Sequence, residues 1–197
     1  MTMKKIIALF VLAVTTPFIG CDTNDDDFYN TEYVRVNGLI NVETQSNYQV
    51  GDKLYINCYA NRLVTEVGQT TPLDIRKTTN NAPSLSFSYV LEKQTSPTEW
   101  TTVTIPNAQI DLTAGAIESI GFYMATANYN GLTDSYQFRA GLPLLSAGTY
   151  KLSYGYNSSA TDVVELRSNS RSSDITLMIY TTSNAVNSEG NYIFTVN

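Results

Sequence analysis

The sequence predicts an all-β domain of antiparallel strands over residues 33–197, and three observations indicate this class. Apolar residues recur with period two along most of this region, which is the spacing of a half-buried strand. Threonine, tyrosine, valine and isoleucine are abundant, as strands prefer. No segment keeps apolar residues at helical spacing for three turns, and the closest candidates, residues 114–117 and 162–166, span one turn each.

The alternating runs, taken in chain order, define the expected strands. They cover residues 34–42, 54–60, 85–92, 99–105, 149–156, 175–179 and 192–196. Turn-forming residues separate them at positions 50–52, 96–98, 130–131 and 147–148. The pair Asn130-Gly131 is the dipeptide best suited to a two-residue hairpin turn, because both positions tolerate a positive φ. A domain of about 165 residues is long enough to bury a core without cross-links.

One local stretch points to a sandwich of two sheets. Residues 145–152, Leu-Ser-Ala-Gly-Thr-Tyr-Lys-Leu, resemble the tyrosine corner of immunoglobulin-like domains. The resemblance implies an antiparallel immunoglobulin-like β-sandwich, in which the Tyr150 hydroxyl bonds to a backbone group a few residues upstream. Leu152 stands where antibody domains carry a cysteine, so the resemblance extends only to the broader sandwich class. Because the domain exceeds the roughly 100 residues of one such unit, we expect extra strands, long loops or a small second lobe.

The first 27 residues have the pattern of an export signal. Lys4 and Lys5 form a positive start, and residues 6–14 form an apolar run. This run is far shorter than the roughly 20 residues that a membrane-spanning helix needs. The segment ends at Phe18-Ile19-Gly20-Cys21, with a small residue before the cysteine. A charged start, a short apolar run and a small residue at the cut are typical of a removable signal peptide.

This N-terminus resembles the signal of bacterial lipoproteins, with residues 18–21 as the lipobox. The resemblance implies cleavage between Gly20 and Cys21 and a diacylglyceryl group on Cys21 that holds the protein on the outer membrane. The acidic residues that follow resemble the surface-export signal of Bacteroidetes-type lipoproteins: Asp22, Asp25, Asp26 and Asp27. Display on the cell surface follows, and the alternative is an acidic spacer on an inward-facing leaflet. We therefore expect a signal peptide over residues 1–20, an acidic tether over 21–32 and a folded domain over 33–197.

The charge of the mature chain disfavours nucleic acid as a partner. Cleavage removes two lysines and no acids, which leaves ten basic against eighteen acidic residues and a net charge of −8. Neutralisation of phosphates by lysine and arginine dominates the affinity of proteins for nucleic acid. Attachment to a membrane would also have to come from acyl chains, because an acidic protein gains nothing from anionic lipid.

The chain has no histidine, and this excludes several kinds of catalytic and metal site. Neither a Ser-His-Asp nor a Cys-His arrangement is possible, nor is a histidine-ligated zinc, copper or iron site. The mature domain has one cysteine besides Cys21, so it forms no internal disulfide, and Cys58 is expected to be a small buried side chain. Residues 22–33 begin like a calcium loop but lack its glycine and its closing glutamate. We predict no cofactor, no metal and no catalytic residue.

Two groups of aromatic residues are candidates for a ligand face. Trp100 falls on the solvent side of its strand, where an indole could stack on a sugar ring or anchor a protein. Alternatively, Trp100 covers a sheet edge or packs under a loop. Tyrosines gather around the expected hairpin: Tyr123, Tyr129, Tyr136 and Tyr156. Loops rich in tyrosine, asparagine and serine are typical of binding surfaces, although such tyrosines also fill cores.

These observations favour a non-catalytic, lipid-anchored surface protein that binds a glycan or a protein. A second hypothesis is a carboxylate-dependent polysaccharide hydrolase, in which Asp111 and Glu118, or Asp134 and Asp162, would meet in space. A third is a pilus-like or accessory subunit of an outer-membrane complex. The position of Arg35, early in the first strand, resembles the trimming position of lipid-delivered pilus subunits, although it also fits a solvent-facing residue of an outer strand.

Overall fold

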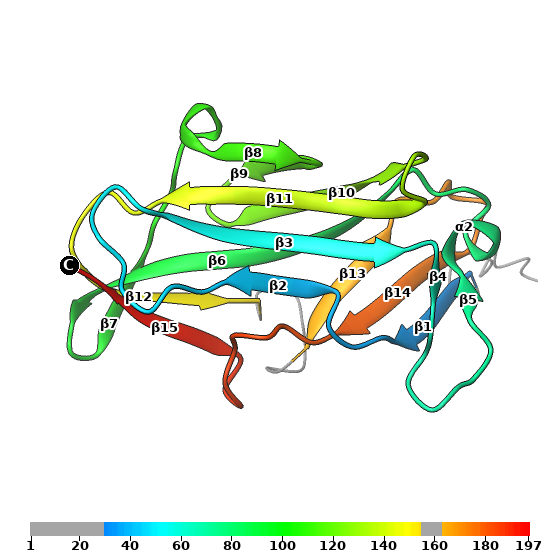
Figure 1. Cartoon of the computed structure of the whole chain (residues 1–197), viewed down its shortest axis with the longest axis horizontal. Coiled ribbons are helices and arrows are strands. Elements are labelled where there is room, and N and C mark those ends of the chain that lie inside the picture. The colour runs from blue at the N-terminus through cyan, green and yellow to red at the C-terminus, as the bar shows by residue number, and fades with distance from the viewer. Residues whose placement is uncertain (1–29, 155–162) are drawn as a thin grey trace, which may run out of the picture.

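A computed structural model describes residues 30–154 and 163–197, and over these residues the chain is all-β, as predicted (Figure 1). The strands are β1 (Thr31–Arg35), β2 (Ile40–Glu43), β3 (Lys53–Asn61), β4 (Leu63–Val64), β5 (Leu73–Asp74), β6 (Ser84–Ser96), β7 (Glu99–Thr102), β8 (Asp111–Ala114), β9 (Ala116–Ser119), β10 (Tyr123–Asn130), β11 (Ser135–Pro143), β12 (Gly148–Ser153), β13 (Val164–Ser168), β14 (Thr176–Thr181) and β15 (Asn191–Val196). The helical elements are α2 (Ile75–Thr78) and the 3-10 turn η1 (Asn107–Gln109).

Most strands belong to one large sheet that curls around itself (Figure 1). Its main path runs β1-β14-β13-β6-β10-β11-β3-β2, while β4 and β5 form a separate small ladder. The long strand β6 joins the parts, because it pairs with β13 and β10 in its first half and with β12 and β7 in its second half. The strand β1 begins at Thr31, inside the segment expected to be tether.

The prediction of a purely antiparallel sheet is wrong. Among the described strands, β1 and β14 form a parallel pair, from Thr31 beside Thr176 to Arg35 beside Tyr180. Parallel strands need a long connection between them, and here nearly the whole domain lies between β1 and β14. A pairing of this kind leaves no signature in the local sequence pattern. The sheet is therefore mixed.

One end of the sheet path, β2, contacts the end of β14 through a backbone bridge and side-chain bonds. Ile40 of β2 forms a parallel bridge with Ser183, just past the end of β14. The Asn184 side chain accepts a bond from the Val42 amide at 2.8 Å and donates to the Val42 carbonyl at 3.1 Å, as a neighbouring strand would. The Leu39 amide also donates to Thr181 Oγ1 at 3.0 Å. These bonds bring β2 and β14 together and enclose the interior of the sheet.

Side chains on the inner face of the curled sheet form the core, with the alternation that the sequence predicts. On β3, Leu54, Ile56, Cys58 and Ala60 are each at most 2 % exposed. Aromatic rings fill the centre, where Phe87 meets Phe138 edge to face and Tyr89 stacks on Tyr123 with 5.2 Å between ring centroids. Large rings suit this space because aromatic side chains bury much area with few rotamers.

The predicted tyrosine corner is confirmed as a local feature. The Tyr150 hydroxyl donates to the Ser146 carbonyl at 2.8 Å, four residues upstream. Tyr150 is 2 % exposed, and its ring stacks on Phe194. The corner fixes the chain where it enters β12. The wider architecture around it is one curled mixed sheet rather than two sheets of purely antiparallel strands.

The predicted two-residue turn between β10 and β11 is wrong. Asn130 pairs with Ser135, so four residues form the loop, and the positive φ of 50° falls on Asp134 rather than on Gly131. The Asn130 side chain accepts a bond from the Leu132 amide at 2.9 Å, which makes the first bend of the loop. The loop carries Leu132 at its outer end, with 98 % of its surface exposed.

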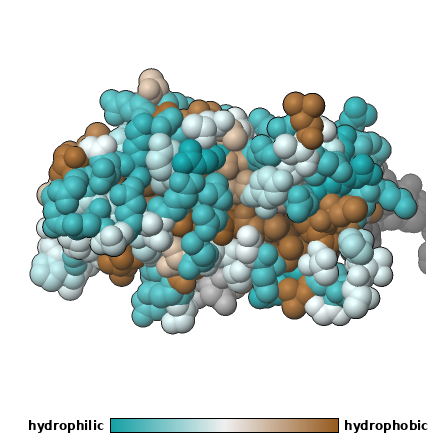
Figure 2. All heavy atoms as spheres, viewed as in Figure 1, coloured by the Kyte–Doolittle hydropathy of each residue, from teal (hydrophilic) through white to brown (hydrophobic). Residues whose placement is uncertain are grey.

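An apolar area lies on the side of the molecule occupied by β2, β4 and β14 (Figure 2). Leu63 of β4 and Val67 in the following loop are about half exposed. The Val67 amide donates to the Arg35 carbonyl at 2.8 Å, so the loop is bonded to the end of β1. Because β1 ends the sheet path, this contact covers part of an edge that would otherwise be open to pairing.

Candidate functional site

Two of the tyrosines predicted for the ligand face belong to the core instead. Tyr123 is 1 % exposed and Tyr136 is fully buried. The Tyr123 hydroxyl accepts a bond from the Ile105 amide at 3.0 Å and donates to the Val103 carbonyl at 2.7 Å. The Tyr136 hydroxyl donates to the Ala82 carbonyl at 2.9 Å. Both residues point inward on strands whose inner face is the core, so neither can contact a ligand in this structure.

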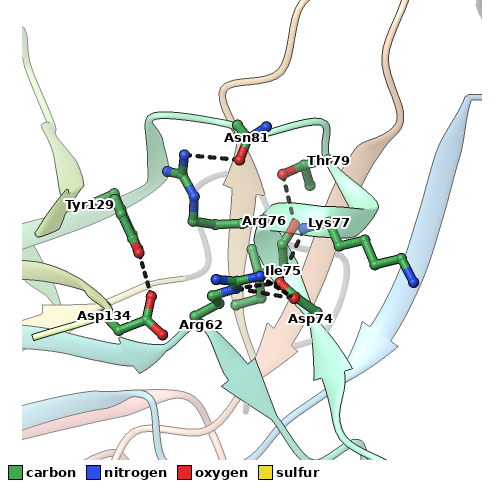
Figure 3. Close-up of polar contacts among 9 residues, drawn as sticks. All are labelled: Arg62, Asp74, Ile75, Arg76, Lys77, Thr79, Asn81, Tyr129 and Asp134. Atoms are coloured by element: carbon green, nitrogen blue, oxygen red, sulfur yellow. Dashed lines mark hydrogen bonds and ion pairs between the residues drawn. The ribbon is translucent and has the colours of Figure 1, made fainter. Parts of the chain in front are cut away.

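Tyr129 is half-buried, and its side chain points towards Asp134 (Figure 3). Its hydroxyl donates to the Asp134 carboxylate across the loop between β10 and β11. The Arg76 guanidinium lies 4.0 Å from the centre of its ring, and Tyr136 packs against it. These contacts join α2 to the loop. The fourth tyrosine of the predicted group, Tyr156, lies outside the described residues.

Trp100 lies on the outer face of its strand, as its parity predicts, and it is half-buried. The Lys151 ammonium sits 4.6 Å from the centre of the indole ring and forms an ion pair with Glu92 at 2.8 Å. Such a cation is attracted by the negative face of the ring. In this structure a lysine therefore occupies an indole face that a sugar would need.

The other predicted residues are also accounted for. Cys58 is buried and unpaired, as expected, and burial raises the pKa of its thiol to about 12. Arg35 is exposed on the edge strand β1. The Asp111 carboxylate is engaged by Lys53 and Tyr55, both at 2.6 Å. Gly20, Cys21, the acidic run after it, and Asp162 lie outside the described residues.

A pocket of about 520 Å³ opens on the outer face of β13, β14, β6 and β10, and we call it the outer pocket. Its volume falls within the range of small-ligand sites. Half of its lining residues are small and polar, with hydroxyls and one amide that belong to Ser86, Ser88, Ser168, Asn169, Ser170 and Thr176. Phe87, Tyr154, Met124 and Met178 contribute apolar surface.

Strand register explains why these side chains meet. Met178 of β14 stands opposite Arg167 of β13, Arg167 opposite Ser86 of β6, and Ser86 opposite Thr126 of β10. Directly opposed residues point to the same side of a sheet. Because Leu85, Leu166 and Leu177 point into the core, the intervening residues must point outward. The outer pocket is thus built on rigid strands.

Hydrogen bonds fix the polar lining. The Asn169 amide nitrogen donates to the hydroxyl oxygens of Ser84 at 2.7 Å and Ser86 at 2.9 Å. The Ser168 and Ser170 hydroxyls lie 2.8 Å apart, and the Leu177 amide donates to Ser168 Oγ. Polar groups held in this way lose little freedom when a ligand binds.

The charges of the outer pocket balance. Among the described residues that line it, Glu165 is the one carboxylate and Arg167 the one cation, and both point outward from β13. A pocket with one charge of each sign and several hydroxyls favours a neutral polar ligand. An anionic ligand would be repelled by Glu165, and a cationic ligand would be repelled by Arg167.

Two stacked tyrosines border the outer pocket, and we call them the tyrosine pair. Tyr33 of β1 and Tyr180 of β14 lie nearly parallel, with an angle of 12° and 6.0 Å between ring centroids. Tyr33 stands opposite Met178, and Tyr180 stands opposite Glu165, so the pair adjoins the pocket lining. Tyr33 is 60 % exposed. Partial burial, followed by the charges of Glu165 and Tyr33, raises the pKa of the Tyr180 hydroxyl, which therefore stays neutral at physiological pH.

The sequence held only part of the signal for this site. Alternation places Tyr33 with Arg35 on the solvent side of the first strand. It also places Tyr180 on the face of its strand opposite to the apolar face of Ile179. The neighbourhood of the two tyrosines depends on the parallel pairing of strands from opposite ends of the domain. No local pattern reports such a pairing.

The described residues offer neither a metal cluster nor a membrane-spanning helix. Over residues 30–154 and 163–197, no three cysteine, aspartate or glutamate side chains gather closely enough to hold a metal ion. Within the same ranges, no helix is long and apolar enough to cross a membrane.

Comparison with models of protein families gave no match, and neither did comparison with curated proteins. The function must therefore be argued from the site itself.

Proposed function

We propose that this protein is a non-catalytic binding protein, anchored by a lipid on Cys21 and displayed on the cell surface, that recognises a glycan. The outer pocket and the tyrosine pair form its binding face. The observation that carries the proposal is the stacked pair of Tyr33, which is 60 % exposed, and Tyr180, which is half-buried, beside a pocket partly lined by hydroxyls. Flat aromatic faces bind the apolar side of a sugar ring, while hydroxyls, amides and charged groups bond to its hydroxyls.

The composition of the face favours a sugar over a protein partner. Protein interfaces are centred on buried apolar or aromatic anchors, with a polar rim. Here the lining is mixed: small hydroxyls, one amide and two charged groups lie beside apolar side chains, and the lining aromatic residues Phe87 and Tyr154 are each only 3 % exposed. The tyrosine pair stands at the border of the pocket. Its one cation and one carboxylate suit the many neutral hydroxyls of a sugar.

The arrangement of acids supports binding rather than hydrolysis. A glycosidase needs two carboxyl groups about 5–9.5 Å apart across the bond that it cleaves. Glu165 has no second carboxylate beside it among the described lining residues. Asp111, an acid proposed for catalysis, is held by Lys53 and Tyr55. Bonds from both partners lower the pKa of Asp111, which disfavours a role as a general acid.

An immunoglobulin-like relationship of the folded domain is part of this proposal. It is supported by the Tyr150 hydroxyl bond at the start of β12. Membrane anchorage rests on the lipobox at residues 18–21, and surface display rests on the acidic run that follows. A tether of about ten residues can extend some 30 Å, which would let the binding face stand clear of the membrane.

Titration of the purified full-length protein in detergent tests the proposal. The probes are neutral polysaccharides, namely glucan, xylan, mannan and galactan. We expect at least one to bind, and we expect Tyr33→Ala combined with Tyr180→Ala to weaken that binding about tenfold or more. Tyr59→Ala is the matched control, because Tyr59 is also half exposed but lies on β3. Absence of binding across the panel, or equal loss in the control, would refute the assignment.

A further inference from the structure

A second pocket, of about 460 Å³, lies next to the outer pocket. It is lined by the loop between α2 and β6, including Asn80 and Asn81, and by Arg171 and Asp174 from the turn before β14. We call it the loop pocket. Seven of its nine lining residues are polar or charged, and Ala82 and Pro83 complete the lining.

The two pockets meet. Asn169 and Ser170, just after the end of β13, line both of them. The Asn169 side chain is held by its bonds to Ser84 and Ser86, so the junction between the pockets has a fixed shape. A ligand that fills the outer pocket and extends past Asn169 reaches the loop pocket.

The loop pocket is held rigid by a network of charged and polar side chains (Figure 3). Asp74 caps α2 by accepting a bond from the Lys77 amide at 3.1 Å, and its carboxylate accepts three bonds from the Arg62 guanidinium, of 2.7, 2.9 and 3.0 Å. Arg76 donates from its side chain to Asn81 Oδ1 at 3.0 Å. The backbone N–H of Asn81 donates to the Arg76 backbone carbonyl at 2.7 Å.

This network holds an unusual backbone. Asn80 and Asn81 both have positive φ values, of 48° and 69°. Asparagine adopts such conformations more readily than other residues with a side chain, and side-chain bonds hold both residues in place here. Asn80 also donates from its side chain to Asp174 at 3.0 Å, which joins the two walls of the pocket. The loop pocket is therefore organised before any ligand arrives.

From the shared lining and the fixed loop we infer that the ligand is an extended oligosaccharide, which spans both pockets as two contiguous subsites. The inference rests on the proposed function and adds to it the class of glycan. A single sugar would occupy one subsite. When one part of a sugar chain is bound in the first subsite, the next part is held close to the second subsite. Its effective concentration there is high, so the whole chain binds more tightly.

The test is a titration of the full-length protein with oligosaccharides of increasing length. The probes are neutral gluco-, xylo- and manno-oligosaccharides, from disaccharide to hexasaccharide. In the series that binds, we expect affinity to rise at least about tenfold between the shortest and the longest member. Asn80→Gly combined with Arg171→Ala should abolish this gain but leave the affinity of the disaccharide unchanged. Glycine at position 80 keeps the positive φ and removes the side-chain amide together with its bond to Asp174.

The outcomes separate the two proposals. Binding of short oligosaccharides with no gain on lengthening would overturn the two-subsite inference and leave the proposed function intact. Lack of binding by every sugar would overturn both. A length-dependent gain that persists in the double variant would mean that the chain runs along another part of the surface, and the inference would again be wrong. Circular dichroism of each variant verifies that it folds.

Discussion

Tyr89 and Tyr123 stack in the core, but their hydroxyls are in opposite situations. The Tyr123 hydroxyl bonds to the Ile105 amide and the Val103 carbonyl. The Tyr89 hydroxyl has no hydrogen-bond partner among the described residues, and its tyrosine is fully buried. An unpaired buried polar group costs stability, whereas a bonded one contributes.

Paired substitutions to phenylalanine test this contrast. Tyr123→Phe leaves a buried amide and a carbonyl without their partner, so we expect the free energy of unfolding to fall by about 1–3 kcal/mol. Tyr89→Phe removes only an unpaired hydroxyl, so we expect the free energy of unfolding to stay the same or to rise slightly. Urea denaturation of both variants measures the difference. Equal losses would show that Tyr89 has a partner, such as a buried water.

For single residues, the sequence predicted which face of the sheet a side chain occupies better than it predicted whether that side chain packs in the core or contacts a ligand. Alternation placed Trp100 on the outer face and Cys58 in the core, and the structure agrees with both. It failed for Tyr123 and Tyr136. Tyrosine is amphipathic, so a tyrosine near a loop reads equally well as a surface contact or as a core ring with a bonded hydroxyl.

The short helix α2 depends on Asp74, which caps it and pairs with Arg62. The bond from Arg62 lowers the pKa of Asp74 from 3.8 to about 2. A lowered pKa means that the stabilisation is fully present above about pH 4 and is lost as the pH falls towards 2. We expect Asp74→Asn to remove this part of the acid sensitivity, as measured by urea denaturation across that window. An unchanged pH dependence would contradict the role of the pair.

The crossover between β8 and β9 requires glycine at position 115. Gly115 has a φ of +80°, and a Cβ there would lie 2.3 Å from the Thr126 carbonyl oxygen. Gly121 has a similar φ of +89° but open space around it. Gly121→Ala should therefore cost about 1–2 kcal/mol for the backbone alone, and Gly115→Ala clearly more. Thermal denaturation of the two variants compares them, and equal losses would show that the close contact relaxes freely.

Individual strands were largely predictable from alternation, whereas the pairing of each strand with its neighbours in the sheet was not. The runs around Leu85, Leu152 and Ile179 became strands β6, β12 and β14. The helix α2 was missed because four residues give no periodic signal. The loop after β10 was misjudged because Asn130-Gly131 fits a tight turn, yet the Asn130 side chain bonds to Leu132 and supports a longer one.

At the scale of the whole molecule, the parallel pairing of β1 with β14 links the N-terminal segment to the binding face. The tether is expected to end where β1 begins, so the tyrosine pair would lie close to the place where the tether joins the folded domain. We expect Cys21→Ser to release the protein from membranes without changing its affinity for glycan. Membrane fractionation measures the first effect and titration the second. A variant that stays on the membrane would contradict the lipid anchor.

The central claim is that the ligand face is the outer pocket with the tyrosine pair, and not the surface around Trp100. The most direct measurement is the dissociation constant of the bound glycan for Tyr180→Ala and Trp100→Ala, each compared with the unmodified protein. Tyr180 borders the pocket, whereas Trp100 is covered by Lys151 on another strand. We expect Tyr180→Ala to weaken binding about tenfold and Trp100→Ala to leave it unchanged. Loss of binding in Trp100→Ala with full binding in Tyr180→Ala would contradict the account.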